Sequence, residues 1–314
     1  MSLLQKPAGE AIAAVKGPSG SVPGSGSGSG SGSRRRRRSR ARVNAQVVIA
    51  LAIIVALLAL ALFAPLIAPY DPDAGDAAQK YLPVGSPGFL LGTDEQGRDI
   101  LSRLIWGGRT SMVVALIAVV ASTILGSSLA LAAGFSGDRV SGLIMRTIDV
   151  MFAFPVIIAA LAFALILGPG LFVVVLAIVF VATPYVTRVV FAEVKRHRGR
   201  EYVEAAVSLG AGFASILFRE VLPNVAGQIV VYATGLVGAM IVFSSSISAL
   251  GIGVQPPTAD WGRMISEGAK VIISGNVTVA LLPGLVVLVA ALAFNWLGDG
   301  LNDLFDPHKR RSRS

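Results

Sequence analysis

The residues that could do chemistry in this 314-residue chain are gathered in a few polar segments that separate long apolar runs. The longest such segment, residues 191–224, reads FAEVKRHRGREYVEAAVSLGAGFASILFREVLPN. Within it, residues 201–209 can form one short helix and residues 213–221 a second, because the glycines between them can end or turn a helix. Two short helices joined by a glycine turn would form a protruding hairpin, whose side chains could bind another molecule. The alternative is an amphipathic hairpin on a membrane surface, where the basic cluster from Lys195 to Arg200 would suit anionic lipid.

The sequence does not indicate a catalytic or ATP-binding centre. The chain has no cysteine, and the dipeptide Gly-Lys of a phosphate-binding loop does not occur. Both histidines, His197 and His308, lie in polar segments, which argues against an intramembrane protease that uses histidine as base or metal ligand. We therefore expect no catalytic residues, no metal site and no cofactor bound by this chain.

A second polar segment, residues 91–111, combines acids with arginines in the sequence LGTDEQGRDILSRLIWGGRTS. One hypothesis is a scaffold: a short surface helix over residues 95–106, capped by Thr93 or Asp94, in which acids pair with arginines and apolar residues face the rest of the protein. The other is direct contact with a substrate-delivering protein or a partner subunit. The candidate contact residues are Asp94, Arg98, Asp99 and Arg103.

A few isolated polar residues lie within or beside the apolar runs. Ser244, Ser245 and Ser248 could line a translocation path, or they could let helices pack closely, as small residues do in membranes. The sequence leaves both interpretations open. Asp149 follows Arg146 by three residues, a spacing that predicts an ion pair at a helix end.

The elements that must position these residues are membrane-spanning helices. The chain is 54% hydrophobic and only 14% charged, with a mean hydropathy of +0.72, which excludes an ordinary water-soluble domain. Runs of about 20 apolar residues predict an all-α protein with six spans that contain no ionisable residue, which argues against an ion-coupled carrier. The expected spans are residues 47–64, 112–133, two between Asp149 and Arg188 that are separated by Gly168-Pro169-Gly170, 227–250 and 277–297.

Basic residues predict the orientation of these spans. With both termini in the cytoplasm, 21 of the 27 Lys and Arg residues fall on the inside, as the positive-inside rule requires. The net charge of +9 therefore indicates orientation, and the Arg34–Arg38 block is an orienting signal that attracts anionic lipid rather than a nucleic-acid-binding arm.

The expected domain organisation follows from these spans. Residues 1–45 form a disordered Ser/Gly- and Arg-rich cytoplasmic tail, and 46–68 the first membrane helix. The expected remainder is an extracytoplasmic segment with the short helix at 69–110, a core of five helices at 111–300, and a basic cytoplasmic tail at 301–314.

The polar loop carries a resemblance to a known family. Glu204-Ala205-Ala206, Gly210 and Leu222-Pro223 resemble the EAA motif of the membrane subunits of bacterial type I ABC importers, with the one departure that Glu220 stands where the motif has Ile. The resemblance implies that residues 191–224 form a coupling loop that docks in a cleft of an ATPase subunit. Alanine and glycine would then allow close approach, and the glutamate would make a polar contact.

Three further stretches narrow the resemblance. Residues 91–111, 251–262 and 295–307 are similar to signatures of the dipeptide, oligopeptide and nickel importer permeases, and more specifically of the C-type permease subunit. The resemblance implies a type I permease fold in the bacterial cytoplasmic membrane, with no ATPase site of its own. The implied partners are a second homologous permease that forms a heterodimer with it, two ATP-binding subunits that carry ATP and Mg, and an extracytoplasmic peptide-binding protein.

The expected function is therefore to translocate di- or oligopeptides, as part of an assembled peptide-transporting ATPase. Nickel, glutathione or another small solute is an alternative substrate. An ATP-independent channel or carrier, or a membrane scaffold, is the alternative from a different class.

Overall fold

The computed structural model describes residues 31–305, and their side chains over residues 45–304. The chain divides into two units, residues 1–41 and 42–314, and of the first the structure describes only the beginning of helix α1. The described residues form helices joined by turns and loops, with isolated β-bridges in place of strands. The main helices are α1 (Ser31–Leu62), α2 (Ala64–Ile67), α3 (Ile100–Phe135), α4 (Asp138–Ala153), α5 (Val156–Leu167), α6 (Leu171–Arg198), α7 (Glu201–Ser208), α8 (Phe213–Ser215), α9 (Leu222–Ala249), α10 (Trp261–Ala269) and α11 (Thr278–Phe305).

Five of the described helices, α1, α3, α6, α9 and α11, are long and apolar enough to cross a membrane. Helices α4 and α5 pass the same test only together, and they are bent by 88° at the break between them, so they form a sixth span if counted as one broken span. Pro155 stands at this break and cannot donate a backbone hydrogen bond. The predicted all-α fold with about six spans is confirmed.

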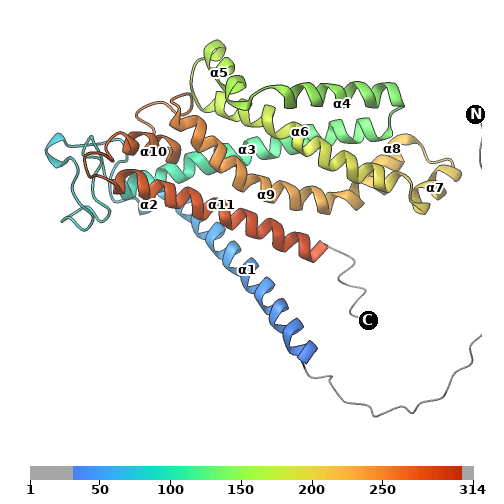
Figure 1. Ribbon diagram of the computed structural model, residues 1–314, viewed down its shortest axis with the longest axis horizontal. Helices are drawn as coiled ribbons and strands as arrows, with labels where there is room; N and C mark the ends of the chain where they lie inside the picture. The colour runs from blue at the N-terminus through green and yellow to red at the C-terminus, as the bar shows by residue number, and fades with distance from the viewer. Residues whose placement is uncertain (1–30, 306–314) are drawn as a thin grey trace, which may run out of the picture. The chain divides into compact units, whose positions relative to one another are not determined.

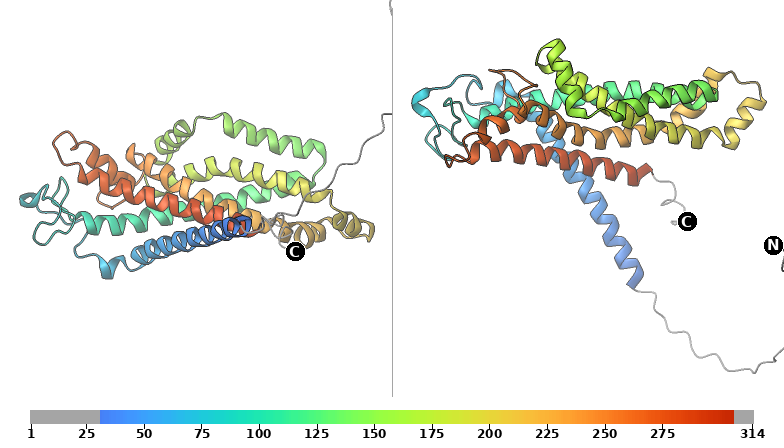
Figure 2. Two further views of the ribbon diagram at one scale, coloured as in Figure 1. Left: turned by 60° about the horizontal axis from the view of Figure 1, so that its bottom comes forward. Right: turned by 45° about the horizontal axis from the view of Figure 1, so that its top comes forward.

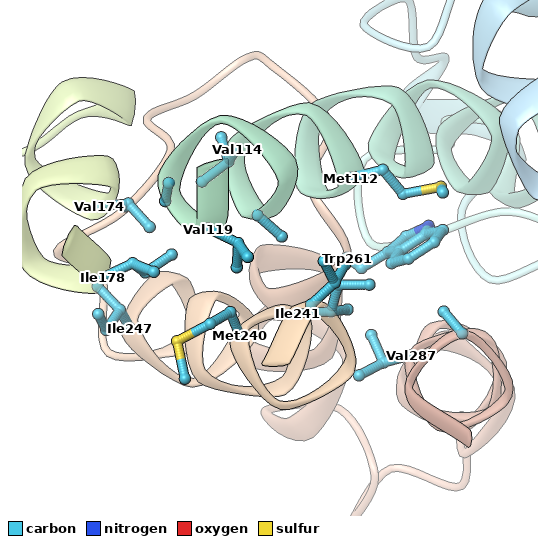
Figure 3. Packing of buried hydrophobic residues seen from close by; sticks show 14 of the residues in the cluster. Met112, Val114, Val119, Val174, Ile178, Met240, Ile241, Ile247, Trp261 and Val287 are labelled. Atoms are coloured by element: carbon cyan, nitrogen blue, oxygen red, sulfur yellow. The ribbon is translucent and has the colours of Figure 1, made fainter. Parts of the chain in front are cut away.

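The core of the second unit lies between α3, α6, α9 and α11. Helix α3 packs most extensively against α6, and α9 against α11 (Figure 1). Side chains from these helices and from α10 point toward one another in one buried cluster, which includes Val119, Ile178, Ile241 and Val287 (Figure 3). Small residues permit close approach, because a Cβ on Gly126 of α3 would come within 2.8 Å of Val186 on α6.

Polar elements gather at the two ends of this helix bundle. One end carries α10 and the segment 68–99, and we call it the α10 end; the other carries α7 and α8, and we call it the α7 end (Figures 1 and 2). The predicted polar segments 91–111 and 191–224 therefore lie at opposite ends of the long helices.

Two predicted boundaries differ from the structure. The expected short helix over residues 95–106 is absent, because α3 begins at Ile100 and continues without a break to Phe135. The Asp99 carboxylate caps its first turn by accepting a hydrogen bond from the Ser102 amide, and nothing between residues 100 and 112 forces the helix to end. Helix α1 begins at Ser31, inside the tail predicted to be disordered, since arginine is a good helix former and extends the apolar helix behind it. The rest of that tail, residues 1–30, and most of the basic C-terminal tail lie outside the described residues.

Candidate functional site

Helix α7 displays Glu204 and Ala205 on a firmly held element, while Ala206 of the motif packs against the buried side. Val203 is only 3% exposed and packs in a second apolar cluster with residues of α6, η2 (Ile216–Val221) and the start of α9. On the opposite face Glu204 and Ala205 are exposed, and among the described residues the Glu204 side chain has no hydrogen bond or ion pair. The packing fixes the helix while its outer face stays free to bind a partner.

Gly210 ends α7 in a conformation that suits glycine. Its φ is +78°, and its amide donates to the Val207 carbonyl at 3.0 Å while the Ala211 amide donates to the Ala206 carbonyl at 3.0 Å. These two bonds form a Schellman motif, which satisfies carbonyls at the helix end and requires a left-handed residue at this position. Gly210 therefore sets the direction in which the chain leaves α7.

Side-chain hydrogen bonds join α7 to the long helices. His197 Nδ1 lies 2.7 Å from the Tyr202 hydroxyl, so the last turn of α6 is tied to the first turn of α7. Arg198 of α6 donates to the Gly134 carbonyl of α3 at 2.8 Å. Burial raises the pKa of the Tyr202 hydroxyl above its ordinary value. A displacement of α7 would consequently be transmitted to α6 and α3.

The last residues of the predicted motif lie where α9 begins. Leu222 and Pro223 occupy its first turn, where a missing proline N–H costs nothing, and Leu222 packs against the apolar cluster beneath α7. Glu220, which replaces the motif's isoleucine, is half-buried, and its charge contributes to the raised pKa of Tyr202. The substitution thus introduces a charge near the joint between α7 and the long helices.

The structure adds apolar residues that the sequence analysis missed. Val207, Leu209, Phe213 and Phe218 are exposed around the tip of the loop, and Leu209 is 88% exposed. Exposed apolar side chains rimmed by polar residues are typical of protein interfaces. Apolar residues in an otherwise polar loop are visible in the sequence, and they could have predicted an interface here.

At the α10 end, the candidate contact residues are buried rather than displayed. Asp94 accepts from Arg98 Nε at 2.7 Å and from Arg103, while Glu267 of α10 lies 2.9 Å from Arg98 and 3.0 Å from Arg103. The side chains of both arginines are less than 10% exposed. The acids and arginines of residues 91–111 do pair with one another. Because these side chains are buried, they support the α10 end from inside and are not part of its exposed surface. Glu267 was missed because it lies 169 residues from Arg98.

Trp261 and Asp260 lock α10 against α3. Trp261 is 1% exposed, and its indole N–H donates to the Leu104 carbonyl at 2.9 Å. Asp260 caps α10 and accepts from Ser111 of α3 at 2.8 Å, and burial raises the pKa of its carboxyl above the ordinary value. A Cβ on Gly108 would lie 2.8 Å from the Trp261 ring, so the glycine pair of the segment makes room for the indole.

The serines of α9 belong to this packing. Ser244, Ser245 and Ser248 are each at most 5% exposed, so in this conformation they do not line an open path. A Cβ on Gly253 would overlap Ser248, and one on Gly262 would overlap the Ser245 backbone. Of the two interpretations that the sequence leaves open, the structure therefore shows close packing.

The described part of the chain is thus a bundle of helices that are long and apolar enough to cross a membrane, with an exposed short helix at one end and a polar cap at the other. Residues 122–311 match the family model of the binding-protein-dependent transport system inner membrane component, and residues 35–83 match the N-terminal transmembrane domain of oligopeptide transport permease C. The chain belongs to the binding-protein-dependent inner membrane component family, the permease subunits of ABC importers, and is a multi-pass membrane protein.

Relatives with assigned names support this assignment. The chain is 45% identical over 252 residues to the di/tripeptide transport system permease protein of Pseudomonas aeruginosa, covering 79% of this chain and 83% of that protein. It is 38% identical to the dipeptide transport system permease protein of Haemophilus influenzae, covering 79% and 85%. It is 37% identical to the glutathione transport system permease protein of Pectobacterium atrosepticum, covering 79% and 82%.

Proposed function

We propose that this chain forms one half of the membrane pathway of an ATP-driven importer of di- or oligopeptides. The observation that carries the proposal is α7, whose buried face packs in a cluster with residues of α6 and η2 while Glu204 and Ala205 of the motif are exposed. Two ATPase subunits that hold ATP and Mg dock on the α7 loops of this chain and of a second, homologous permease. This chain supplies no ATPase site and binds no cofactor itself.

The proposed orientation places both termini and the α7 end in the cytoplasm, where ATPase subunits are. The excess of basic residues in the segments assigned to this side supports it. The α10 end then faces outward, where a binding protein delivers the substrate. A hollow of about 610 Å³ at that end, lined in part by Pro65, Tyr70, Asp71 and Trp106, supports a contact with that protein.

The proposed mechanism is alternating access. ATP binding closes the ATPase pair and displaces α7, and the hydrogen bonds from Tyr202 to His197 and from Arg198 to Gly134 carry the displacement to α6 and α3. The two permeases then rock between inward-open and outward-open arrangements. Peptide is favoured as substrate because two of the relatives named above carry peptides in their names. Glutathione is the second candidate, since a relative of similar identity is named for it.

The test is to reconstitute the complete importer and measure peptide-stimulated ATP hydrolysis and peptide uptake. Replacement of Glu204 by Ala together with Gly210 by Ala should lower peptide uptake while the complex still assembles. Asp138→Ala is the matched control, because it removes an exposed carboxylate at the same end of the bundle but outside α7. Unchanged uptake in the α7 variant would remove the coupling assignment. Stimulation by glutathione and not by dipeptides would change the substrate.

A further inference from the structure

Arg188 and Asp149 form an exposed ion pair within the membrane-spanning part of the chain. Arg188 Nη2 of α6 lies 2.5 Å from Asp149 Oδ1 of α4, and the two side chains are 52% and 56% exposed. The sequence analysis placed both residues at the edges of spans and expected Asp149 to pair with Arg146. The structure instead places them within α6 and α4 and joins the two helices through their charges.

By helix length, Arg188 falls within one bilayer thickness of the start of α6. Arg188 is 17 residues beyond Leu171, the start of α6, which corresponds to about 26 Å of helix at 1.5 Å per residue. The hydrocarbon core of a bilayer is about 30 Å thick, so it includes Arg188 whether it is measured from Leu171 or centred on the helix. The basic residues that mark the end of α6, from Lys195 to Arg198, lie further along.

Charges at this depth face protein or water rather than lipid, because leaving an ionised group in hydrocarbon costs several kcal/mol. Half of each side chain is nevertheless open in the isolated subunit. The pair also lies shortly before the break in the α4–α5 span, with Asp149 four residues before the end of α4 at Ala153. Interrupted membrane helices expose unpaired carbonyls to water-filled cavities and concentrate negative potential at a helix C-terminus.

Aromatic side chains hold the guanidinium and continue the open surface. The Arg188 guanidinium carbon lies 4.5 Å from the centre of the Phe152 ring, and Phe152 meets Tyr185 edge to face at 4.8 Å. Tyr185, which meets Phe152, is itself exposed. One fixed positive charge, one negative charge and apolar rings thus occupy one patch of α4 and α6.

We propose that Arg188 and Asp149 form a subsite for the free termini of a zwitterionic peptide in the passage between the two permeases. The inference rests on the proposed peptide-import function. The guanidinium takes the peptide carboxylate and the Asp149 carboxylate takes the ammonium group, while Tyr185 contacts the peptide side chains. When the passage is empty, the two residues neutralise each other, so release of the peptide strands no charge within the membrane.

The test compares peptides with free and blocked termini in the reconstituted importer. Asp149→Asn should lower uptake of a free dipeptide about 3- to 10-fold while leaving residual uptake of its N-acetylated form unchanged, and Arg188→Gln should do the same with the C-terminally amidated form as the insensitive substrate. Arg139→Gln is the matched control, since it removes an exposed arginine from α4, ten residues before Asp149 and outside both the patch and residues 191–224. Each variant is compared with the unmodified importer for the same peptide, so the preference of the binding protein cancels.

Equal losses for free and blocked peptides would overturn the subsite, because they would indicate a structural role. If the unmodified importer takes up no peptide, the proposed function itself fails, which is a distinguishable outcome.

Access of water to the patch gives a second measurement that does not depend on the charged variants. The chain has no cysteine, so Tyr185→Cys can be introduced into an importer whose other subunits lack cysteine. The proposal expects reaction with a charged, water-soluble thiol reagent and protection by a free dipeptide. A thiol that does not react would show that lipid or the partner permease covers the pair, and a thiol that reacts without protection would show that water reaches the patch but the peptide does not bind there. Either result would overturn the subsite.

Discussion

The backbone conformation of Gly210 gives a specific prediction about the C-terminal end of α7. Its φ of +78° lies in the left-handed region, and a Cβ added there would meet no atom within 4 Å. The cost of Gly210→Ala is therefore conformational and not steric, about 1–2 kcal/mol for an L-residue in this region. That free energy corresponds to a roughly 5- to 30-fold larger population of the opened α7 C-terminus.

Hydrogen exchange of the assembled importer measures this opening directly. The amides of Gly210 and Ala211, which donate the two bonds of the Schellman motif, should exchange faster by that factor in Gly210→Ala, and peptide uptake should fall with them. Gly210→Asn should be milder, because asparagine tolerates the left-handed region better than alanine. Gly199→Ala is the matched control in the same loop, since Gly199 has a φ of −92° and equally open surroundings. Equal exchange in Gly210→Ala and Gly199→Ala would refute the argument.

Three further substitutions test the α10 end. Gly108→Ala should destabilise the subunit by about 1–3 kcal/mol, because its Cβ would lie 2.8 Å from the Trp261 ring; an unchanged unfolding temperature of the purified complex would contradict the packing. Asp94→Asn should cost about 3–5 kcal/mol, because it leaves two buried arginines with less compensation; a loss below 1 kcal/mol in chemical unfolding would show that the network is not needed. Asp260→Asn tests the raised pKa of that carboxyl. The folded state holds the proton more tightly than the unfolded state, so this contribution to stability is present at acidic pH and is lost as pH rises through the raised pKa. The variant should therefore show a smaller fall in unfolding temperature between acidic and neutral pH, and an identical fall would contradict the assignment.

The sequence predicted the membrane spans and the short helix before Gly210 because both depend on local information, while docking of this loop on an ATPase subunit stays a prediction. Apolar runs of about 20 residues identify membrane helices whatever their neighbours are. The left-handed conformation of Gly210 and the Schellman motif that ends α7 likewise depend on a few neighbouring residues, so the sequence was sufficient to locate them.

What the sequence could not predict depends on contacts between distant residues. Trp261 donates a hydrogen bond to the Leu104 carbonyl, 157 residues away in the sequence. Without knowledge of this contact, Gly107 and Gly108, which make room for the indole, indicate the end of a helix. Arg188 likewise indicated the edge of a span, because it ends an apolar run. The sequence does not show that α6 continues past this arginine, which is paired with Asp149 on α4. Long-range pairing thus decides which polar residues are scaffold and which stay open.

The most direct test of the account is ATP-dependent uptake of a dipeptide by proteoliposomes that contain this chain, the second permease, both ATPase subunits and the binding protein. We expect uptake to require ATP on the side of the α7 end. Replacing Glu204 on the exposed face of α7 by Ala, together with Leu209 just after α7 by Ser, should abolish uptake while the complex still assembles. Uptake that proceeds without ATP, or that is unaffected by these replacements, would contradict the account.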